Sequence, residues 1–161
     1  MNALQVLASD VLERAKTRGV MVTTAESCTG GLVAAHLTEI AGSSSVVDRG
    51  FVTYSNTAKS ELLGVPAGLI EAEGAVSRAV ARAMAEGALG RSRAGLAVSV
   101  TGVAGPGGGT EAKPVGLVWF AIAGTGRPTR SLERRFGDVG RAKVRALSVE
   151  TALTLFKRAL A

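Results

Sequence analysis

Hydrophobic residues at helical spacing predict five helices along the chain. Between Leu4 and Ala15 they recur every three or four positions, and Gly19 follows where such a helix would end. Further helices are predicted over residues 32–40, 57–63, 78–90 and 141–160. Asn56 and Ser77 precede two of them and belong to the residue types that cap helix N-termini.

Short apolar or alternating runs predict five strands, over residues 20–22, 46–55, 94–100, 115–123 and 129–136. No helix is predicted between the last three, which favours antiparallel pairing there, whereas helices separate the earlier strands. We therefore expect an α/β fold, a three-layer α/β/α sandwich with a mixed central sheet, formed by residues 1–161 as a single domain.

The composition supports a globular protein, since 47% of the residues are hydrophobic and 20% are charged. One cysteine and one histidine exclude a disulfide framework and a zinc site built from these residue types. A lone cysteine also fits the reducing cytoplasm, where we expect the protein to be. We expect no targeting segment and no membrane span, because the longest apolar run, near residues 117–123, is too short.

The net charge of +6 suggests an anionic partner only weakly. Seven of the 19 basic residues fall between Arg127 and Arg145, a cluster suited to nucleic acid, to a small phosphorylated ligand or to a solvated surface. Phe136 is the one aromatic residue inside it, so a stacking platform for single strands is missing. We favour the solvated surface and expect no nucleic-acid partner.

A turn rich in hydroxyls and glycines follows the first predicted strand and leads into the helix that starts near Leu32. Its residues 23–31 read TTAESCTGG. Backbone N–H groups at such a turn can bind a phosphate, a carboxylate or an oxyanion beside a nucleophilic hydroxyl. Alternatively, Ser27 or Thr29 caps the helix and the glycines permit close packing. The local pattern leaves both interpretations open.

A hydroxyl nucleophile needs a base, and the pattern favours a lysine over the single histidine. A rise of about 1.5 Å per residue puts Cys28 and His36 on the order of 12 Å apart, and His36 lies in an apolar stripe typical of packing. Lys59 falls in the first turn of a predicted helix, on the unfavourable side of its dipole, and close to Tyr54. Such a lysine acts as a base only if desolvation or a neighbouring positive charge lowers its pKa.

Residues 101–110 form the most glycine-dense loop, TGVAGPGGGT. It lacks the Gly-Lys-Ser/Thr ending of a phosphate-binding Walker loop. It also fails the dinucleotide fingerprint, because Thr110 stands where the third glycine is due. The loop either binds an anion through its N–H groups or makes a tight, closely packed turn.

Four segments in this order resemble the CinA C-terminal domain family, the nicotinamide-nucleotide amidases. They are AESCTGG at 25–31, YSNTAKSELLGV at 54–65, GAVS at 74–77, and TGVAGPGGGTEAKPVG at 101–116. The resemblance spans almost the whole chain. Larger family members carry an additional amino-terminal domain, for which this chain has no room.

The resemblance implies hydrolysis of the carboxamide of nicotinamide mononucleotide to nicotinate mononucleotide and ammonia, in pyridine nucleotide recycling. It implies Ser27 as the nucleophile, Lys59 as the general base and Tyr54 as an assisting residue, with no metal and no organic cofactor. It also suggests a homodimer. The residues expected to contact the substrate are Thr29, Gly30, Gly31, Ser44, Thr101, Gly102, Gly105 and Arg141.

Arg141 is expected to bind the phosphate, but the segment before it departs from the family's Phe-x-Gly-Asp-Arg pattern. Here residues 136–141 read FGDVGR, so Arg145 competes for the same role. The alternative function is a catalytically silent nucleotide-binding or competence-associated interaction module on the same fold. The intact Ser27, Tyr54 and Lys59 favour the enzyme.

Overall fold

The computed structural model describes residues 1–161 and contains one five-stranded sheet in the order β2-β1-β3-β4-β5. The strands are β1 Val22–Glu26, β2 Val47–Val52, β3 Leu96–Gly102, β4 Leu117–Gly124 and β5 Arg127–Arg135. β1 pairs in parallel with both β2 and β3, whereas β3, β4 and β5 pair antiparallel. The predicted mixed sheet is therefore confirmed.

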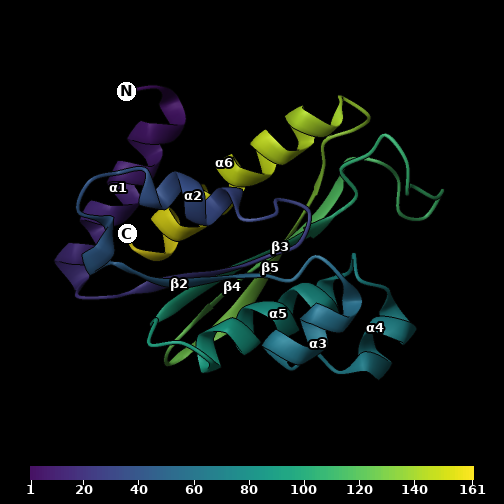
Figure 1. Cartoon of the computed structure of the whole chain (residues 1–161), viewed down its shortest axis with the longest axis horizontal. Helices are drawn as coiled ribbons and strands as arrows, with labels where there is room; N and C mark the ends of the chain where they lie inside the picture. Colours follow the sequence, from purple (N-terminus) through teal and green to yellow (C-terminus); the bar gives the residue numbers. More distant parts are fainter.

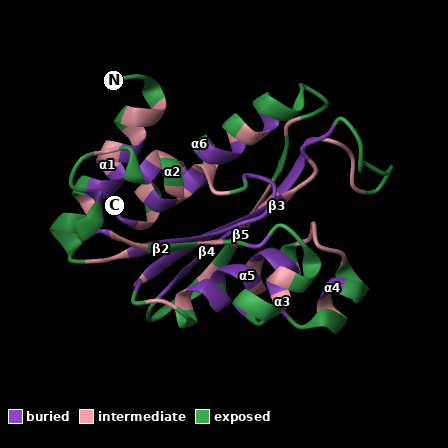
Figure 2. Ribbon diagram, in the orientation of Figure 1, coloured by how far each residue is buried: buried purple, intermediate pink, exposed green.

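Helices cover both faces of the sheet, as the predicted three-layer sandwich requires (Figure 1). One layer holds α1 Ala3–Arg18, α2 Leu32–Thr38 and α6 Arg141–Ala159, and the other holds α3 Asn56–Leu63, α4 Ala67–Glu73 and α5 Arg78–Gly90. Figure 2 shows that the central strands and the inward helix faces are largely buried while the outer helix faces are exposed. None of these helices is long and apolar enough to span a bilayer.

Most predicted helix boundaries agree with the structure, and two details differ. Gly19 ends α1 in the left-handed conformation and Ser77 caps α5, both as predicted. The cap of α3 is Ser55 and not Asn56, because the Ser55 hydroxyl accepts the Ala58 N–H at 3.0 Å. The structure also adds α4, a short helix that the sequence analysis did not predict.

The first strand begins later than predicted and extends into the segment that was expected to be a turn. β1 contains Thr23, Thr24 and Glu26, all of them buried. Polar residues are tolerated in a buried strand when each finds a hydrogen-bond partner. Thr23 Oγ1, for example, donates to the Arg49 carbonyl of β2 at 2.6 Å.

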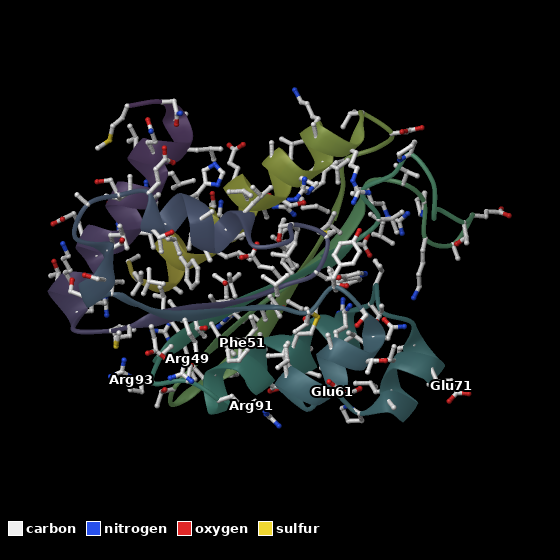
Figure 3. The ribbon with its side chains drawn as sticks, in the orientation of Figure 1. Arg49, Phe51, Glu61, Glu71, Arg91 and Arg93 are labelled. Carbon is white, nitrogen blue, oxygen red and sulfur yellow. The ribbon has the colours of Figure 1, made fainter.

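An ion-pair cluster fastens β2 to the loop before β3. The Asp48 carboxylate, almost fully covered, accepts the Arg93 backbone N–H at 3.0 Å and pairs with Arg93 Nη2 and Arg49 Nε, each at 2.8 Å. The Arg93 N–H and both guanidinium groups hold the pKa of Asp48 below its usual range. In Figure 3, Arg49, Arg91 and Arg93 gather at one end of the sheet, away from Glu71 on α4.

β5 forms one edge of the sheet. It carries four of the seven clustered basic residues, and every member of that cluster except Arg145 is exposed: Arg127, Arg130, Arg134, Arg135, Arg141 and Lys143. This placement agrees with the predicted solvated surface.

Candidate active site

The site forms where the three parallel strands end. Ser27 follows β1, Thr53 and Tyr54 follow β2, and Thr101 lies at the end of β3. Parallel strands present their carboxyl ends at the same edge of a sheet, which is the usual place for a ligand site. The Ser27 N–H donates to the Val100 carbonyl at 2.9 Å and the Thr53 N–H donates to the Glu26 carbonyl at 2.8 Å.

Lys59 reaches this edge from α3 and meets Ser27. Its Nζ lies 3.1 Å from Ser27 Oγ, 3.1 Å from the Thr53 carbonyl and 3.3 Å from the Tyr54 carbonyl. The side chain is only 1% exposed and makes no ion pair. Charged lysines are almost never buried without a carboxylate partner. Desolvation by this burial lowers the pKa of Lys59.

The three neighbours of Nζ are oxygen atoms, which a neutral amine can contact as well as a charged one. A neutral lysine has two N–H donors and one lone pair, while the charged form has three donors and no acceptor. Two carbonyl oxygens can take the two N–H groups, and the lone pair then remains for the Ser27 hydroxyl proton. The arrangement can therefore remove a proton from Ser27.

Glu26 is a buried carboxylate that supports the site and that the sequence analysis did not single out. The side chain is 0% exposed, and it accepts from Thr29 Oγ1 at 2.6 Å, from the Val33 N–H at 2.9 Å and from the Ala34 N–H at 3.1 Å. Gly31, the residue before α2, has no side chain to cap that helix, so Glu26 does so and fixes the turn that carries Ser27. A carboxylate at the end of a buried strand was the available signal.

The side chain of Thr29 and the two glycines that follow it shape the turn and leave only backbone groups for a substrate. The Thr29 hydroxyl is buried and occupied by Glu26, so Thr29 can contact a substrate only through its backbone. Gly30 and Gly31 adopt φ values of 57° and 105°, which side chains disfavour. Their predicted contact with a substrate remains a prediction for the backbone.

Cys28 and His36 take no part in the Ser27–Lys59 contact. Burial raises the pKa of the Cys28 thiol to about 12, with the Glu26 carboxylate adding to the rise. The thiol is therefore protonated near neutral pH and is a poor nucleophile. His36 is half-buried on α2, and its Nδ1 lies 2.8 Å from the Leu32 carbonyl of the same helix.

Arg141 and Arg145, one turn apart on α6, contact different parts of the site. Arg141 Nη2 donates to the Tyr54 hydroxyl at 3.0 Å and Nη1 donates to the Gly105 carbonyl at 2.9 Å. Tyr54 is 60% exposed, so this pair stands at the solvent side of the site. Arg145 instead donates to the carbonyls of Cys28 and Thr29, at 3.1 and 3.2 Å.

The glycine-rich loop joins the site mainly through packing. Thr101 is buried, and its hydroxyl donates to the Ala75 carbonyl at 2.9 Å. A side chain on Gly102 would overlap Val118, and one on Gly105, where φ is 83°, would overlap Val115. The predicted substrate contacts of Thr101, Gly102 and Gly105 therefore stay predictions for their backbone groups.

Ser44 lies away from this site. It is exposed in a short 3₁₀ helix, Ser43–Ser45, which precedes β2, whereas Tyr54 follows the same strand. A strand of 6 residues is about 20 Å long, at about 3.3 Å per residue. Within one chain, Ser44 therefore cannot complete the pocket around Ser27, contrary to the expectation from the resemblance.

The fold and the site together define a class: three-layer α/β proteins in which a serine hydroxyl at the end of a parallel strand lies against a buried lysine. The comparison with family models agrees. The chain belongs to the family of the CinA C-terminal domain, whose model matches residues 4–160.

Individual relatives fall into two lengths. The nicotinamide-nucleotide amidohydrolase PncC of Enterobacter agglomerans is 49% identical over 156 residues, covering 95% of each protein. A CinA-like protein of Synechococcus sp. (strain RCC307) is 53% identical over 152 residues, but the chain spans only 36% of its length. The crystal structure of competence/damage inducible protein CihA from Agrobacterium tumefaciens is 52% identical, with a TM-score of 0.96 over 99% of this chain and 96% of that one.

Proposed function

We propose that this chain hydrolyses the carboxamide of nicotinamide mononucleotide, giving nicotinate mononucleotide and ammonia, as a step of pyridine nucleotide recycling. The observation that carries the proposal is the buried Lys59 amine, which has no carboxylate partner and lies 3.1 Å from Ser27 Oγ. The likeness to a nicotinamide-nucleotide amidohydrolase of equal length supports the substrate. The chain spans about a third of the length of the CinA-like relative, so the proposal does not extend to the activity of that longer protein.

In the proposed reaction neutral Lys59 takes the proton from Ser27 as Oγ attacks the carboxamide carbon. The tetrahedral intermediate collapses when Lys59 returns this proton to the amide nitrogen, so that the C–N bond breaks and ammonia leaves. A water molecule then attacks the ester on Ser27 and gives its proton to Lys59, which passes it back to Oγ. The sum is one water consumed, one acid and one ammonia formed.

In the proposal, Arg141 binds the phosphate of the substrate and Tyr54 lies between this phosphate and Lys59. A guanidinium is suited to phosphate oxygens, and Arg141 is exposed beside the glycine-rich loop. The Tyr54 hydroxyl accepts from Arg141 while the Tyr54 carbonyl contacts Lys59. Tyr54 thus connects the proposed phosphate ligand to the base and would set the distance between phosphate and carboxamide.

The proposal takes residues 1–161 as one catalytic domain that acts as a homodimer in the cytoplasm. The resemblance suggests the dimer, and the lone buried Cys28 fits a reducing compartment. Sedimentation of the purified protein tests the dimer directly.

The decisive experiment measures ammonia release from nicotinamide mononucleotide by the wild type, Ser27→Ala and Lys59→Met. We expect turnover in the wild type and a loss of about 100-fold or more in both variants. Lys16→Met on α1, far from the site, is the matched control and should keep full activity. Activity that survives Ser27→Ala rejects Ser27 as the nucleophile. A folded wild type that binds the nucleotide without turnover favours the silent binding module.

A further inference from the structure

We infer that Arg145 is a positioning residue for this hydrolysis. It acts through the peptide groups that follow Ser27 and keeps their N–H groups directed at the reacting carbonyl. The inference rests on the proposed function, and it assigns Arg145 a role distinct from phosphate binding.

Arg145 is the residue of α6 that holds the Ser27 turn. Its Nε donates to the Cys28 carbonyl at 3.1 Å and its Nη2 donates to the Thr29 carbonyl at 3.2 Å. A planar guanidinium gives two such bonds with a fixed geometry, which a lysine cannot reproduce. Nη2 also lies in van der Waals distance of where a Gly30 side chain would begin, so the guanidinium rests on the turn itself.

These two bonds, together with one inside the turn, fix three successive peptide groups. In a trans peptide the C=O and the N–H point in opposite directions, so the Thr29 N–H is directed away from Arg145. The Thr29 carbonyl faces Arg145, and the Gly30 N–H on that same peptide donates to the Ser27 carbonyl at 3.0 Å. This bond in turn directs the Cys28 N–H out of the turn.

The N–H groups of Cys28 and Thr29 donate to no other residue of the protein, although both residues are buried. Buried N–H groups almost always have a partner, so two unpaired ones beside a nucleophile call for a ligand. A carbonyl oxygen that becomes negative in the tetrahedral intermediate is such a ligand. The positive charge of Arg145 on the Cys28 carbonyl further polarises the peptide that carries the Thr29 N–H and strengthens this group as a donor.

Arg141 provides the contrast within the same helix. Its contacts are with an exposed tyrosine and the glycine-rich loop, not with the Ser27 turn. Loss of Arg141 should therefore weaken substrate binding, whereas loss of Arg145 should slow the chemical step.

The experiment compares kcat and KM for nicotinamide mononucleotide in Arg145→Met, Arg145→Lys and Arg141→Met. We expect kcat to fall about 100-fold in Arg145→Met, as for the loss of an oxyanion donor, with KM changed less than about 3-fold. Arg145→Lys should recover part of kcat because one carbonyl keeps a donor. Arg141→Met should chiefly raise KM. Arg130→Met on exposed β5 is the control.

Binding separates a positioning role from a merely structural one. In a Ser27→Ala background, Arg145→Met should leave the dissociation constant for nicotinamide mononucleotide unchanged, and the melting temperature should stay within a few degrees of the parent. An unchanged kcat with a raised KM in Arg145→Met would overturn the inference, as would equal loss of kcat and fold in both Arg145 variants. Absence of ammonia release by the wild type would remove the proposed function, and the inference with it.

Discussion

Replacing Lys59 with Met removes a titrating group from the core, so the pH dependence of unfolding reports directly on the charge of Lys59. The folded protein lowers the pKa of Lys59 by desolvation, whereas the unfolded chain has the ordinary lysine pKa of about 10.4. Between these two pKa values the unfolded chain binds one proton more than the folded protein. The stability contributed by Lys59 is therefore fully present above about pH 10.4 and is lost as the pH falls through the lowered pKa.

The size of the effect follows from a single proton. Across this window the free energy of unfolding of the wild type rises by up to about 1.4 kcal/mol per pH unit relative to Lys59→Met. The side chain is 1% exposed, so little screening by solvent reduces the shift of the Lys59 pKa, which sets the width of this pH window.

Cys28 titrates in part of the same range with the opposite sign. Its pKa is raised to about 12 in the folded protein, whereas an unfolded cysteine loses its proton near about pH 8.5. Above that pH the cysteine destabilises the fold. The pH dependence of the wild type by itself therefore does not show the contribution of Lys59. The difference between wild type and Lys59→Met cancels this contribution, and a second pair made in a Cys28→Ala background checks the cancellation.

The assay is urea unfolding from about pH 7 to about pH 10, followed by circular dichroism, for wild type and Lys59→Met. Stability curves that run parallel over this range would mean that Lys59 keeps its proton when folded. Such a result would refute Lys59 as the general base, whatever the activity of the variants.

Three further outcomes are expected. Thr53→Val should raise the free energy of unfolding by about 1 kcal/mol in chemical denaturation, because Thr53 Oγ1 is buried without a partner. Gly87→Ala should lower the melting temperature despite the better helix propensity of alanine, because the new methyl would overlap the Leu63 carbonyl of α3; a stability equal to or above wild type would contradict this packing. Cys28 should react with iodoacetamide near neutral pH far more slowly than in urea-unfolded protein, as mass spectrometry would show, because burial keeps the thiol protonated.

The fold was predictable because the hydrophobic positions that indicate each helix and strand are the positions that pack in the core. The mixed sheet, the three layers and the cap at Ser77 all follow from local pattern. The extension of β1 to Glu26 did not, since Thr23, Thr24 and Glu26 are polar and their burial depends on partners elsewhere in the chain. Residue pattern alone does not reveal such partners.

In the site, too, some features were visible in the local sequence and others depend on contacts between distant residues. A lysine in the first turn of α3 opposes the helix dipole, and this local conflict correctly marked Lys59 as unusual. The sequence could not distinguish the contacts of Arg141 from those of Arg145, because both lie on one face of α6. Their different partners depend on how α6 packs against the rest of the chain. Glu26 was missed because its role is to satisfy backbone groups that exist only once α2 has formed.

The arginines of β5 have a consequence for how copies of this chain behave at high concentration. An outer strand with unpaired N–H and C=O groups is a template on which a second chain can add by strand pairing, the first step toward insoluble aggregates. Arg127, Arg130, Arg134 and Arg135 place like charges along that edge, and Pro128 removes one of its N–H donors. Two such edges repel each other, so the charge that resembled a binding surface in the sequence protects solubility.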